Sequence, residues 1–364
     1  MNIIFHYPLP VDKNARSASG IRPLRMLEAF DELGFNVDLV AGSSAERKRG
    51  IARIQRKVRQ GVRYEFVYAE SSTMPTALTD PHHLPLRPFM DWRFFEWCKA
   101  HSIPVGLFYR DVYWRFESYG VHLNAIKKAL AIVAYRFDLW VYQRTLRKLY
   151  LPSMEMGRYI PSVHASRFEA LPPGHASPSI SPVESVPSSG PPLKLFYVGG
   201  MSSHYQLHEL FKAVRELPQV ELTICTRQTE WQEVKHEYAD LTPNIKVIHE
   251  AGTAMESHLV DSHVAVLFVR PQEYREFAAP MKLYEYLGYG KPILATEGTL
   301  AGRFVRENGI GWAIPYRKHS VQQLLSQLVV NPAALDEFRG RLTKISKQHS
   351  WRARAEQVVA GLSR

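Results

Sequence analysis

The sequence predicts an α/β protein made of two Rossmann-like domains, each built around a parallel β-sheet. Three observations predict this fold. The 364 residues exceed what one hydrophobic core usually supports. Short apolar segments typical of buried strands alternate with amphipathic segments typical of helices, which indicates parallel βαβ units. The alternation restarts after a stretch rich in Ser and Pro, so we expect two sheets in series rather than one long sheet.

The first domain is expected at residues 1–174 and opens with a buried strand at 3–5. A helix follows, whose apolar residues recur at helical spacing: Leu24, Leu27, Phe30 and Leu33. Gly34 ends this helix. Later strands are predicted at 37–40, 66–69 and 105–109. A C-terminal helix at 350–364 is expected to pack back on this domain.

A linker is predicted at residues 175–192, HASPSISPVESVPSSGPP, because almost no large apolar side chain occurs there. The second domain is expected at 193–349. It contains a predicted helix at 208–216 and six predicted strands, at 193–198, 221–225, 246–249, 265–269, 292–295 and 312–314. The order of strands and helices again indicates a parallel sheet.

Composition narrows the class of protein. Hydrophobic residues make up 45% of the chain, which fits a globular protein with a substantial core. Cys98 and Cys225 are far apart and in no metal-ligand spacing, so we predict neither a disulfide framework nor a metal site. Residues 1–7 are too short for the apolar core of a signal peptide, and no stretch reaches the roughly 20 apolar residues of a membrane span. A cytoplasmic protein is expected.

The formal net charge of +11 predicts attraction to an anionic partner. A dense basic run is expected on one helix and the loop after it: Arg47, Lys48, Arg49, Arg53, Arg56, Lys57, Arg59 and Arg63. This run is either a solvated helix face or a contact with an anionic membrane, which would place the protein peripherally on the inner face of the plasma membrane. Nucleic acid is not expected as a partner, since no base-reading motif is present.

Residues 126–151 mix apolar and aromatic side chains with several Lys and Arg. Such a segment can lie in a membrane interface. A core helix with a charged outer face is the interpretation we favour from the sequence.

The segment from Glu276 to Pro292, EFAAPMKLYEYLGYGKP, carries the strongest chemical signal. A helix is expected to begin near Pro280, because the first helical turn tolerates proline. Lys282 and Glu285 share a face near that start. A lysine at a helix N-terminus suits a diphosphate, and a nearby carboxylate suits a ribose diol. The same spacing also fits an ordinary surface Lys–Glu pair.

This segment resembles the nucleotide-sugar motif of family 4 and related GT-B glycosyltransferases, and it is also similar to the donor motif of the xanthan glucuronosyltransferase. The matching residues are Pro280, Lys282, Leu283, Glu285, Tyr286, Leu287, Gly290, Lys291 and Pro292. The resemblance implies a GT-B fold, in which two Rossmann-like domains face across a cleft. It also implies that Lys282 binds the diphosphate of a UDP-sugar, that Glu285 binds the ribose and that Met281 lies close to the nucleotide. No cofactor or metal is implied, because the nucleotide-sugar is the substrate and basic side chains stabilise the leaving diphosphate.

The sequence departs from the family pattern in two places. Where the family carries a first glutamate, eight positions before the second, this chain has Phe277. Glu276 lies one place away and is a candidate catalytic carboxylate near the transferred sugar. The second departure is in the first strand-to-helix turn of the C-terminal domain, YVGGMSSHYQL, where relatives carry a basic residue shortly after a glycine.

That turn still provides donor-binding candidates. Gly199 and Gly200 keep the part of the turn where the backbone must approach the donor closely. Ligands of open α/β sheets gather at the carboxyl ends of strands, so residues on the loops there are the next candidates. They are His204, Tyr205, Arg227 and Arg270. For His204, an ordinary loop histidine is the alternative.

The acceptor site is expected in the N-terminal domain. Arg110 and Asp111 follow the predicted strand 105–109 directly, at its carboxyl end. Inverting GT-B enzymes need a general base, and the xanthan enzyme has an aspartate after a similar Tyr-Arg stretch. Asp111 is therefore the candidate base, and a cap of the following helix is its alternative. Gly20, at the start of the first helix, is a candidate for close approach to a substrate, or a plain loop glycine.

The resemblance implies a metal-independent glycosyltransferase of the hexosyltransferase class. It would move a sugar from a nucleotide diphosphate donor to a saccharide or lipid-linked acceptor in cell-surface polysaccharide or glycan assembly. A non-catalytic nucleotide-sugar binding protein is the alternative, since the first glutamate is absent. A dinucleotide-dependent enzyme ranks lower, because neither half shows G-x-G-x-x-G after a strand.

Overall fold

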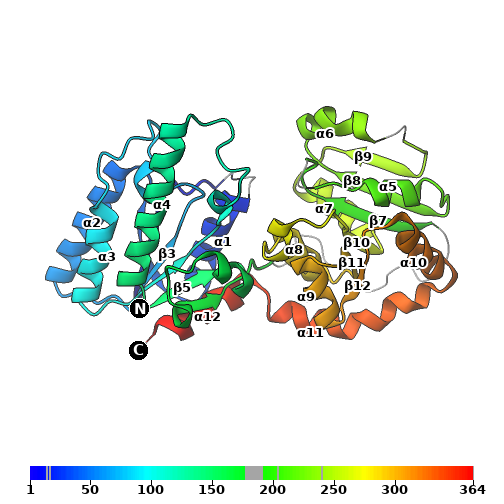
Figure 1. Cartoon of the computed structure of the whole chain (residues 1–364). Helices are drawn as coiled ribbons and strands as arrows, with labels where there is room; N and C mark the ends of the chain where they lie inside the picture. Colours follow the sequence, from blue (N-terminus) through cyan, green and yellow to red (C-terminus); the bar gives the residue numbers. More distant parts are fainter. Residues whose placement is uncertain (14, 16–17, 177–191, 203–204, 239–240, 364) are drawn as a thin grey trace. The chain divides into compact units, whose positions relative to one another are not determined.

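The computed structural model describes residues 1–13, 15, 18–176, 192–202, 205–238 and 241–363. The chain divides into two compact units (Figure 1). Unit 1 consists of Met1–Pro173 and Trp351–Arg364, and unit 2 consists of Gly174–Ser350. Apart from His175, Ala176 and Pro192, the predicted linker at 175–192 lies outside the described residues.

Unit 1 contains a six-stranded parallel sheet with the spatial order β2-β1-β3-β4-β5-β6. The strands are β1 (Asn2–Tyr7), β2 (Asn36–Ala41), β3 (Val67–Glu70), β4 (Val105–Phe108), β5 (Lys148–Leu151) and β6 (Phe168–Ala170). The α-helices are α1 (Ala18–Glu32), α2 (Ser44–Arg59), α3 (Met90–Ala100), α4 (Ala125–Thr145) and α12 (Trp351–Leu362).

Helices cover both faces of this sheet (Figure 1). Because crossovers between parallel strands are right-handed, the strand order places α1 on one face and α2, α3 and α4 on the other. β3 and β4 are buried along their whole length, which explains their continuous apolar character. The C-terminal helix α12 packs against α1, and Arg354 Nε donates a hydrogen bond to the Pro173 carbonyl at 3.3 Å.

Unit 2 contains a second six-stranded parallel sheet with the order β12-β11-β10-β7-β8-β9. The strands are β7 (Leu193–Val198), β8 (Val220–Cys225), β9 (Ile245–Ile248), β10 (Val264–Leu267), β11 (Ile293–Thr296) and β12 (Gly311–Ile314). The α-helices are α5 (His208–Val214), α6 (Gln228–Val234), α7 (Thr253–Asp261), α8 (Met281–Gly288), α9 (Leu300–Asn308), α10 (Lys318–Val330) and α11 (Arg339–Lys347).

The order of strands in unit 2 reverses between β7 and β10. From β7 the chain runs outward to β8 and β9, then returns to β10 on the other side of β7 and continues to β11 and β12. In open α/β sheets, ligands bind at the carboxyl ends of the strands at such a reversal. The two parallel sheets confirm the predicted α/β class, and their connectivity marks the loops after β7 and β10 as the place to look for a site.

The basic run on α2 does not form one solvated face. Arg47 is only 1% exposed, and its guanidinium forms two hydrogen bonds to Asp91, from Nε to Oδ1 at 3.0 Å and from Nη2 to Oδ2 at 3.1 Å. Lys57 pairs with Asp38 at 2.8 Å. Neither a solvated helix face nor a membrane contact therefore describes Arg47, because that side chain lies on the inner side of α2 and neutralises a buried acid.

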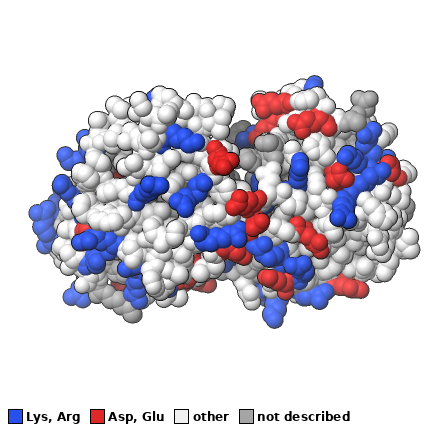
Figure 2. Space-filling view, in the orientation of Figure 1, with Lys and Arg blue, Asp and Glu red and all other residues white. Residues whose placement is uncertain are grey.

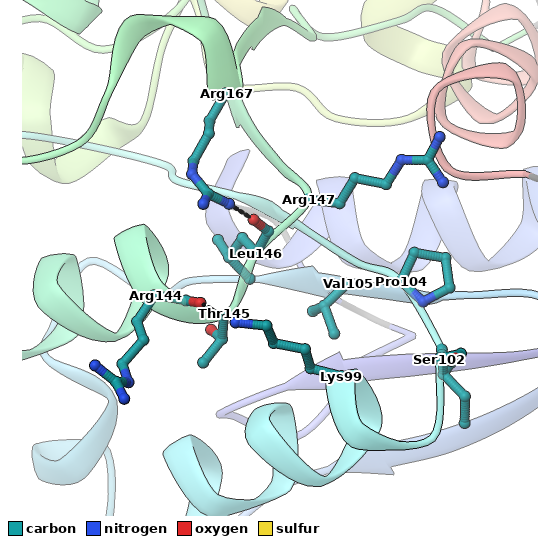
Figure 3. Close-up of a pocket in the computed structure, with 10 residues that line it drawn as sticks. Lys99, Ser102, Pro104, Val105, Arg144, Thr145, Leu146, Arg147 and Arg167 are labelled. Carbon is teal, nitrogen blue, oxygen red and sulfur yellow. Dashed lines mark hydrogen bonds between the residues drawn. The ribbon is translucent and has the colours of Figure 1, made fainter.

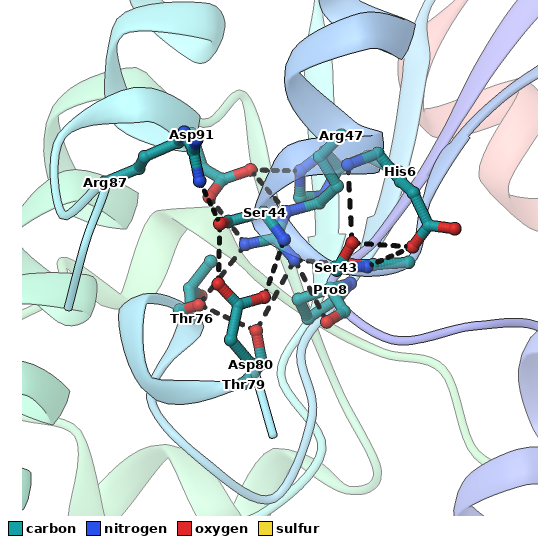
Figure 4. A network of polar contacts seen from close by, with 12 residues as sticks. His6, Pro8, Ser43, Ser44, Arg47, Thr76, Thr79, Asp80, Arg87 and Asp91 are labelled. Atoms are coloured by element: carbon teal, nitrogen blue, oxygen red, sulfur yellow. Dashed lines mark hydrogen bonds and ion pairs between the residues drawn. The ribbon is translucent and has the colours of Figure 1, made fainter. Parts of the chain in front are cut away.

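Arg47 belongs to a polar network that joins β1, α2 and α3 (Figure 4). His6 Nε2 lies 2.8 Å from Asp91 Oδ1. Burial alone would raise the pKa of Asp91, but the Arg47 charge and the His6 hydrogen bond outweigh burial and hold that pKa at about 2. Ser44, at the start of α2, donates from its backbone N–H and its hydroxyl to Asp80, each at 2.6 Å. The network fixes α2 and α3 to the sheet.

Asp138 is a second buried carboxyl group, on the inner side of α4, where it accepts a hydrogen bond from the Thr76 backbone N–H at 2.8 Å. Burial raises its pKa from 3.8 to about 7. The free energy of unfolding should therefore fall as the pH rises through this range, because native Asp138 keeps a proton that the unfolded chain releases. Asp138→Asn keeps an acceptor for Thr76 and removes the titration.

Urea unfolding of both proteins at about pH 5 and about pH 8 measures this difference. The variant is expected to lose less stability than the wild type between the two conditions. Equal losses would contradict an elevated pKa at Asp138.

Candidate functional site

The turn after β7 is held rigidly at the carboxyl edge of the unit 2 sheet. The Tyr197 hydroxyl donates to the Gly200 carbonyl at 2.7 Å, and the Met201 backbone N–H donates to Glu230 Oε2 at 2.9 Å. A Cβ atom on Gly199 would lie 2.7 Å from the Tyr197 hydroxyl, and one on Gly200 would lie 2.9 Å from Glu230 Oε2. At Gly199 a side chain would crowd the buried ring of Tyr197, whereas at Gly200 it would displace only the end of the Glu230 side chain. The two glycines leave the backbone of this turn open to close approach.

The predicted basic candidates lie on neighbouring loops of the same edge. Arg227, directly before α6, is exposed and forms an ion pair with Glu230 at 2.9 Å. Arg270, after β10, is exposed and donates to Gln206 Oε1 at 3.2 Å. Glu230 and Gln206 thus link both arginines to the loop after β7. His204 lies outside the described residues.

Tyr205 covers a buried arginine that sequence reasoning missed. The guanidinium of Arg275 lies 3.9 Å from the centroid of the Tyr205 ring, and Arg275 is buried. Arg275 belongs to a short 3-10 helix, Glu273–Glu276, in the loop after β10. Its only sequence signal was its position shortly before Glu276. This contact ties the loops after β7 and β10 together at the point where the strand order reverses.

Helix α8 is anchored beside this edge by its apolar face. Leu283 and Leu287 are buried, and the hydroxyl of buried Tyr286 accepts a hydrogen bond from the backbone N–H of Val198, the last residue of β7, at 2.9 Å. Pro280 is the N-cap residue, with no side chain capping the helix start. The N–H groups of the first turn therefore have no side-chain cap, which is the arrangement that suits an anion.

Lys282 and Glu285 lie on α8 as the spacing predicted. Lys282 Nζ is 2.7 Å from Glu285 Oε2, and the two side chains are 32% and 29% exposed. Burial raises the pKa of the Cys225 thiol at the end of β8, and the Lys282 ammonium is close enough to oppose that rise. The pair is thus partly accessible, and its lysine lies near the carboxyl end of β8.

The residues before α8 show how the family pattern is altered. Phe277, at the position of the missing glutamate, is buried in contact with the ring of Tyr274. Glu276 is half-buried, and its backbone carbonyl accepts a hydrogen bond from Arg303. Met281, the first residue of α8, is also half-buried. The position of the family glutamate is therefore a core position in this chain, and Glu276 is the carboxylate next to it.

Lys291 of the Gly-Lys-Pro match has a structural role. It is buried, and its Nζ donates to the carbonyls of Val260 and Ser262, each at 2.7 Å, at the end of α7. Burial lowers the pKa of Lys291 to about 8. A cation bound to the last carbonyls of a helix stabilises its C-terminus.

In unit 1, Asp111 follows β4 and shapes the next turn. Its Oδ1 accepts a hydrogen bond from the Tyr113 backbone N–H at 2.8 Å, at the start of the 3-10 helix Tyr113–Arg115. This contact is a local turn rather than the expected helix cap, because the N-cap residue of the 3-10 helix is Val112 and no side chain caps it. Asp111 Oδ1 therefore fixes the backbone of the turn that follows β4.

Arg110 belongs to a cluster of charged side chains at the carboxyl edge of the unit 1 sheet. Arg110 Nη2 lies 2.8 Å from Glu70 Oε2, and Arg22 Nε lies 3.3 Å from Glu70 Oε1. The Tyr68 hydroxyl donates to the same Oε1 at 3.0 Å. Glu70, at the end of β3, is fully buried and was missed, although an acid directly after a predicted strand was the available signal. Gly20 lies in the first turn of α1, two residues from Arg22.

A cavity of about 270 Å³ opens at the other edge of the unit 1 sheet, at the amino ends of β4 and β5 (Figure 3). Its lining includes Lys99, Arg144, Arg147 and Arg167. Lys99 and Arg167 donate to the carbonyls of Arg144 and Leu146, and Arg144 pairs with Glu96. These cations stabilise the end of α4, so we do not place the donor there. Among the described residues, no group of three or more His, Cys, Asp or Glu side chains is placed to hold a metal ion.

Known protein families and solved structures resemble this chain in its second unit and in its fold. Residues 192–330 match the family described as Glycosyl transferases group 1. No curated protein sequence matches the chain. The crystal structure of HepE from Anabaena in complex with UDP has a TM-score of 0.68 and 12% sequence identity, and the match covers 100% of this chain and 99% of HepE.

Two further solved structures share the architecture. Sucrose-phosphate synthase from Thermosynechococcus elongatus has a TM-score of 0.63 and 12% identity, with 99% of this chain and 98% of that chain covered. WaaG, a glycosyltransferase involved in lipopolysaccharide biosynthesis, has a TM-score of 0.58 and 12% identity, with 100% and 99% covered. At such identities the likeness concerns the fold. The chain therefore has the GT-B fold seen in these structures, and its residues 192–330 match the family of group 1 glycosyl transferases.

Proposed function

We propose that this protein transfers a hexosyl group from a UDP-sugar to a saccharide or lipid-linked acceptor. The observation that carries the proposal is the uncapped start of α8, with the Lys282–Glu285 pair, beside the glycine turn of β7 at the reversal of strand order. This arrangement lies inside the matched group 1 domain. HepE, which shares the fold, was solved with UDP and with UDP-glucose.

In the proposed donor site, different residues contact different parts of the UDP-sugar. Lys282 binds the diphosphate, Glu285 the ribose hydroxyls, and Met281 lies against the nucleotide. Gly199 and Gly200 allow the backbone to approach the donor. The other proposed donor contacts at the carboxyl edge of the unit 2 sheet are Tyr205, Arg227 and Arg270. The two arginines add positive charge there. The positive end of the α8 dipole and these cations would stabilise the departing diphosphate without a metal ion.

In the proposed reaction the acceptor hydroxyl oxygen attacks the anomeric carbon of the donor. The bond between that carbon and the diphosphate oxygen breaks, and UDP leaves. Asp111 takes the proton of the acceptor hydroxyl, and Arg110 with Glu70 holds the loop that carries it. Glu276 is the second candidate carboxylate, on the donor side.

A non-catalytic nucleotide-sugar binding protein is the second candidate function. One observation favours it, namely the buried phenylalanine at position 277 where the family carries a catalytic glutamate. A dinucleotide-dependent oxidoreductase has no such support, because the turn after β7 has adjacent Gly199 and Gly200 with no third glycine in Rossmann spacing.

We also propose a cytoplasmic setting in cell-surface polysaccharide or glycan assembly, with the enzyme peripheral to an anionic membrane. The net charge of +11 supports this setting, since cationic proteins are attracted to the negative surface of the cytoplasmic leaflet.

A panel of UDP-, GDP- and dTDP-sugars tests the proposal. Calorimetry with each nucleotide measures binding, and release of free nucleotide with and without candidate acceptors measures turnover. We expect UDP to bind more tightly than GDP or dTDP, and a UDP-sugar to turn over. Tight binding without release of UDP under any condition would favour the binding protein, and failure of all nucleotides to bind would overturn both functions.

A further inference from the structure

Helix α4 presents an apolar stripe to solvent as well as one to the core. The stripe consists of Ile126, Leu130, Val133, Phe137 and Trp140, spaced three or four residues apart and so on one side of the helix. Ile126 is 82% exposed, Leu130 47%, Val133 62% and Trp140 44%. The opposite side carries the buried residues, among them Tyr135, Leu139 and Tyr142. The outer side of this helix therefore carries an exposed apolar stripe in addition to the charged residues expected from the sequence.

Aromatic side chains from the start of α3 extend the stripe. Phe89 lies 5.7 Å from Phe137, and Trp92 lies 5.3 Å from Trp140, measured between ring centroids. Phe137 and Trp140 stack on one another at 5.8 Å. Phe89 is exposed, so the cluster is built at the surface rather than in the core. We call these two aromatic residues and the five residues of the stripe the α4 face.

The charges around the α4 face are almost all positive. Exposed or half-buried cations on α3 and α4 are Arg93, Lys99, Lys127, Lys128, Arg136 and Arg144. The acids of these two fully described helices are Asp91 and Asp138, which are buried, and Glu96, which pairs with Arg144 at 3.1 Å. Figure 2 shows that the side of unit 1 carrying α3 and α4 is mostly uncharged surface with scattered Lys and Arg.

We propose that the α4 face docks on the surface of an anionic lipid bilayer, with the apolar stripe in the headgroup region and the flanking cations on lipid phosphates. Helices that lie in the interface combine an apolar stripe with Lys and Arg. Tryptophan is enriched at that depth because its ring is apolar and its N–H is polar. No helix in the described part of the chain is long and apolar enough to span a membrane, so the contact is peripheral.

A second copy of this chain is the competing occupant, because the three- and four-residue spacing also suits packing against another helix. In a two-fold symmetric dimer, however, the α4 face would meet itself. The flanking cations of both copies would then oppose one another, with Glu96 the only acid near the surface of these helices. Charge complementarity therefore favours an anionic membrane.

This inference rests on the proposed function in one respect: a lipid-linked acceptor is the reason for the protein to contact a membrane. Flotation of the full-length protein with phosphatidylglycerol–phosphatidylcholine vesicles tests it. Wild-type protein should float at low salt and retain part of its binding at high salt, because screening removes the ionic part and leaves the apolar part. Vesicles of phosphatidylcholine alone should bind less.

The informative variant is Ile126→Glu/Val133→Glu, which places two carboxylates in the most exposed part of the stripe. Its partition onto the anionic vesicles should fall by roughly tenfold or more, with an unchanged melting temperature. The matched control is Val330→Glu at the end of α10, where an 85% exposed valine lies in unit 2. That variant should float like the wild type.

Two further measurements on the same preparations distinguish a failure of the membrane proposal from a failure of the proposed function. UDP calorimetry reports the proposed function, so lost flotation with intact UDP binding concerns the α4 face alone. Light scattering reports the oligomeric state. Wild-type protein that does not float, or a double variant that floats as well as wild type, would overturn the proposal. If the double variant instead converts a dimer to a monomer with flotation unchanged, the α4 face is an interface between copies.

Discussion

The Asp111→Asn variant is expected to turn over donor and acceptor about 10²- to 10⁴-fold more slowly than the wild type while binding UDP with the same affinity. Asparagine is not basic at neutral pH, so it cannot accept the proton of the acceptor hydroxyl. The proposed donor site lies in unit 2, in residues that the substitution does not change. Turnover by release of UDP and affinity by calorimetry measure the two effects separately.

Asparagine is the informative replacement because of the turn that Asp111 makes. The Asp111 Oδ1 accepts the Tyr113 backbone N–H at 2.8 Å, and the oxygen of an asparagine can accept the same bond. The melting temperature of this variant should therefore stay unchanged. Asp111→Ala is the control that removes both acceptor and charge, and it should lose about 1 kcal/mol of stability, the worth of one hydrogen bond, as well as activity.

Near-normal turnover in Asp111→Asn, with reduced stability in Asp111→Ala, would show that Asp111 only shapes the turn. Glu276 would then become the leading carboxylate. Glu276→Gln should in that case lower turnover, and the stereochemistry of the product, measured by NMR, should be examined for retention.

Lys282→Ala is expected to weaken UDP binding by about 1.5 to 3 kcal/mol, which is roughly a tenfold to hundredfold increase in Kd. The reason is the loss of a charge-assisted contact to the diphosphate at the start of α8. Because the Lys282–Glu285 pair is about one third exposed, its loss should cost the fold little. Calorimetry with UDP measures the change, and an unchanged melting temperature shows that the fold is intact.

Lys212→Ala is the matched control for this variant. Lys212 Nζ lies 2.7 Å from Glu209 Oε1 in another three-residue pair of the same unit, on α5. It should bind UDP like the wild type. Glu285→Ala should also weaken binding, through a lost ribose hydrogen bond. Unchanged affinity in both Lys282→Ala and Glu285→Ala would mean that the pair is only a surface pair.

Local sequence patterns were sufficient for much of the fold. The predicted strand at 193–198 coincides with β7, and the prediction of a helix near Pro280 agrees with α8, which begins at Met281. Continuous apolar runs mark buried parallel strands, and helical spacing marks an amphipathic helix, so these elements are readable from neighbours in the chain. β6 has only 3 residues, which is too short for a strand pattern to be recognised in its sequence.

Charged side chains were harder to interpret, because their burial depends on partners far along the chain. In the sequence, Arg47 is one member of a basic run, but the acid that it pairs with, Asp91, is 44 residues away. Arg110 is separated from buried Glu70 by 40 residues. Lys291 belongs to the segment that resembles a donor motif, but its hydrogen-bond acceptors are backbone carbonyls at the end of α7. A buried charge is tolerated only with a partner, and no local pattern reveals that partner.

The sequence by itself determined the α/β class with its two parallel sheets, and it brought Lys282 and Glu285 onto one face at the start of a helix, since both follow from spacing along the backbone. Only the tertiary structure decided that α8 packs against the end of β7, through a hydrogen bond between residues 88 positions apart. It alone also decided that Arg47 is enclosed and that the apolar stripe of α4 faces solvent. Helical periodicity gives the sides of a helix, but which side is covered depends on how the other elements pack against it.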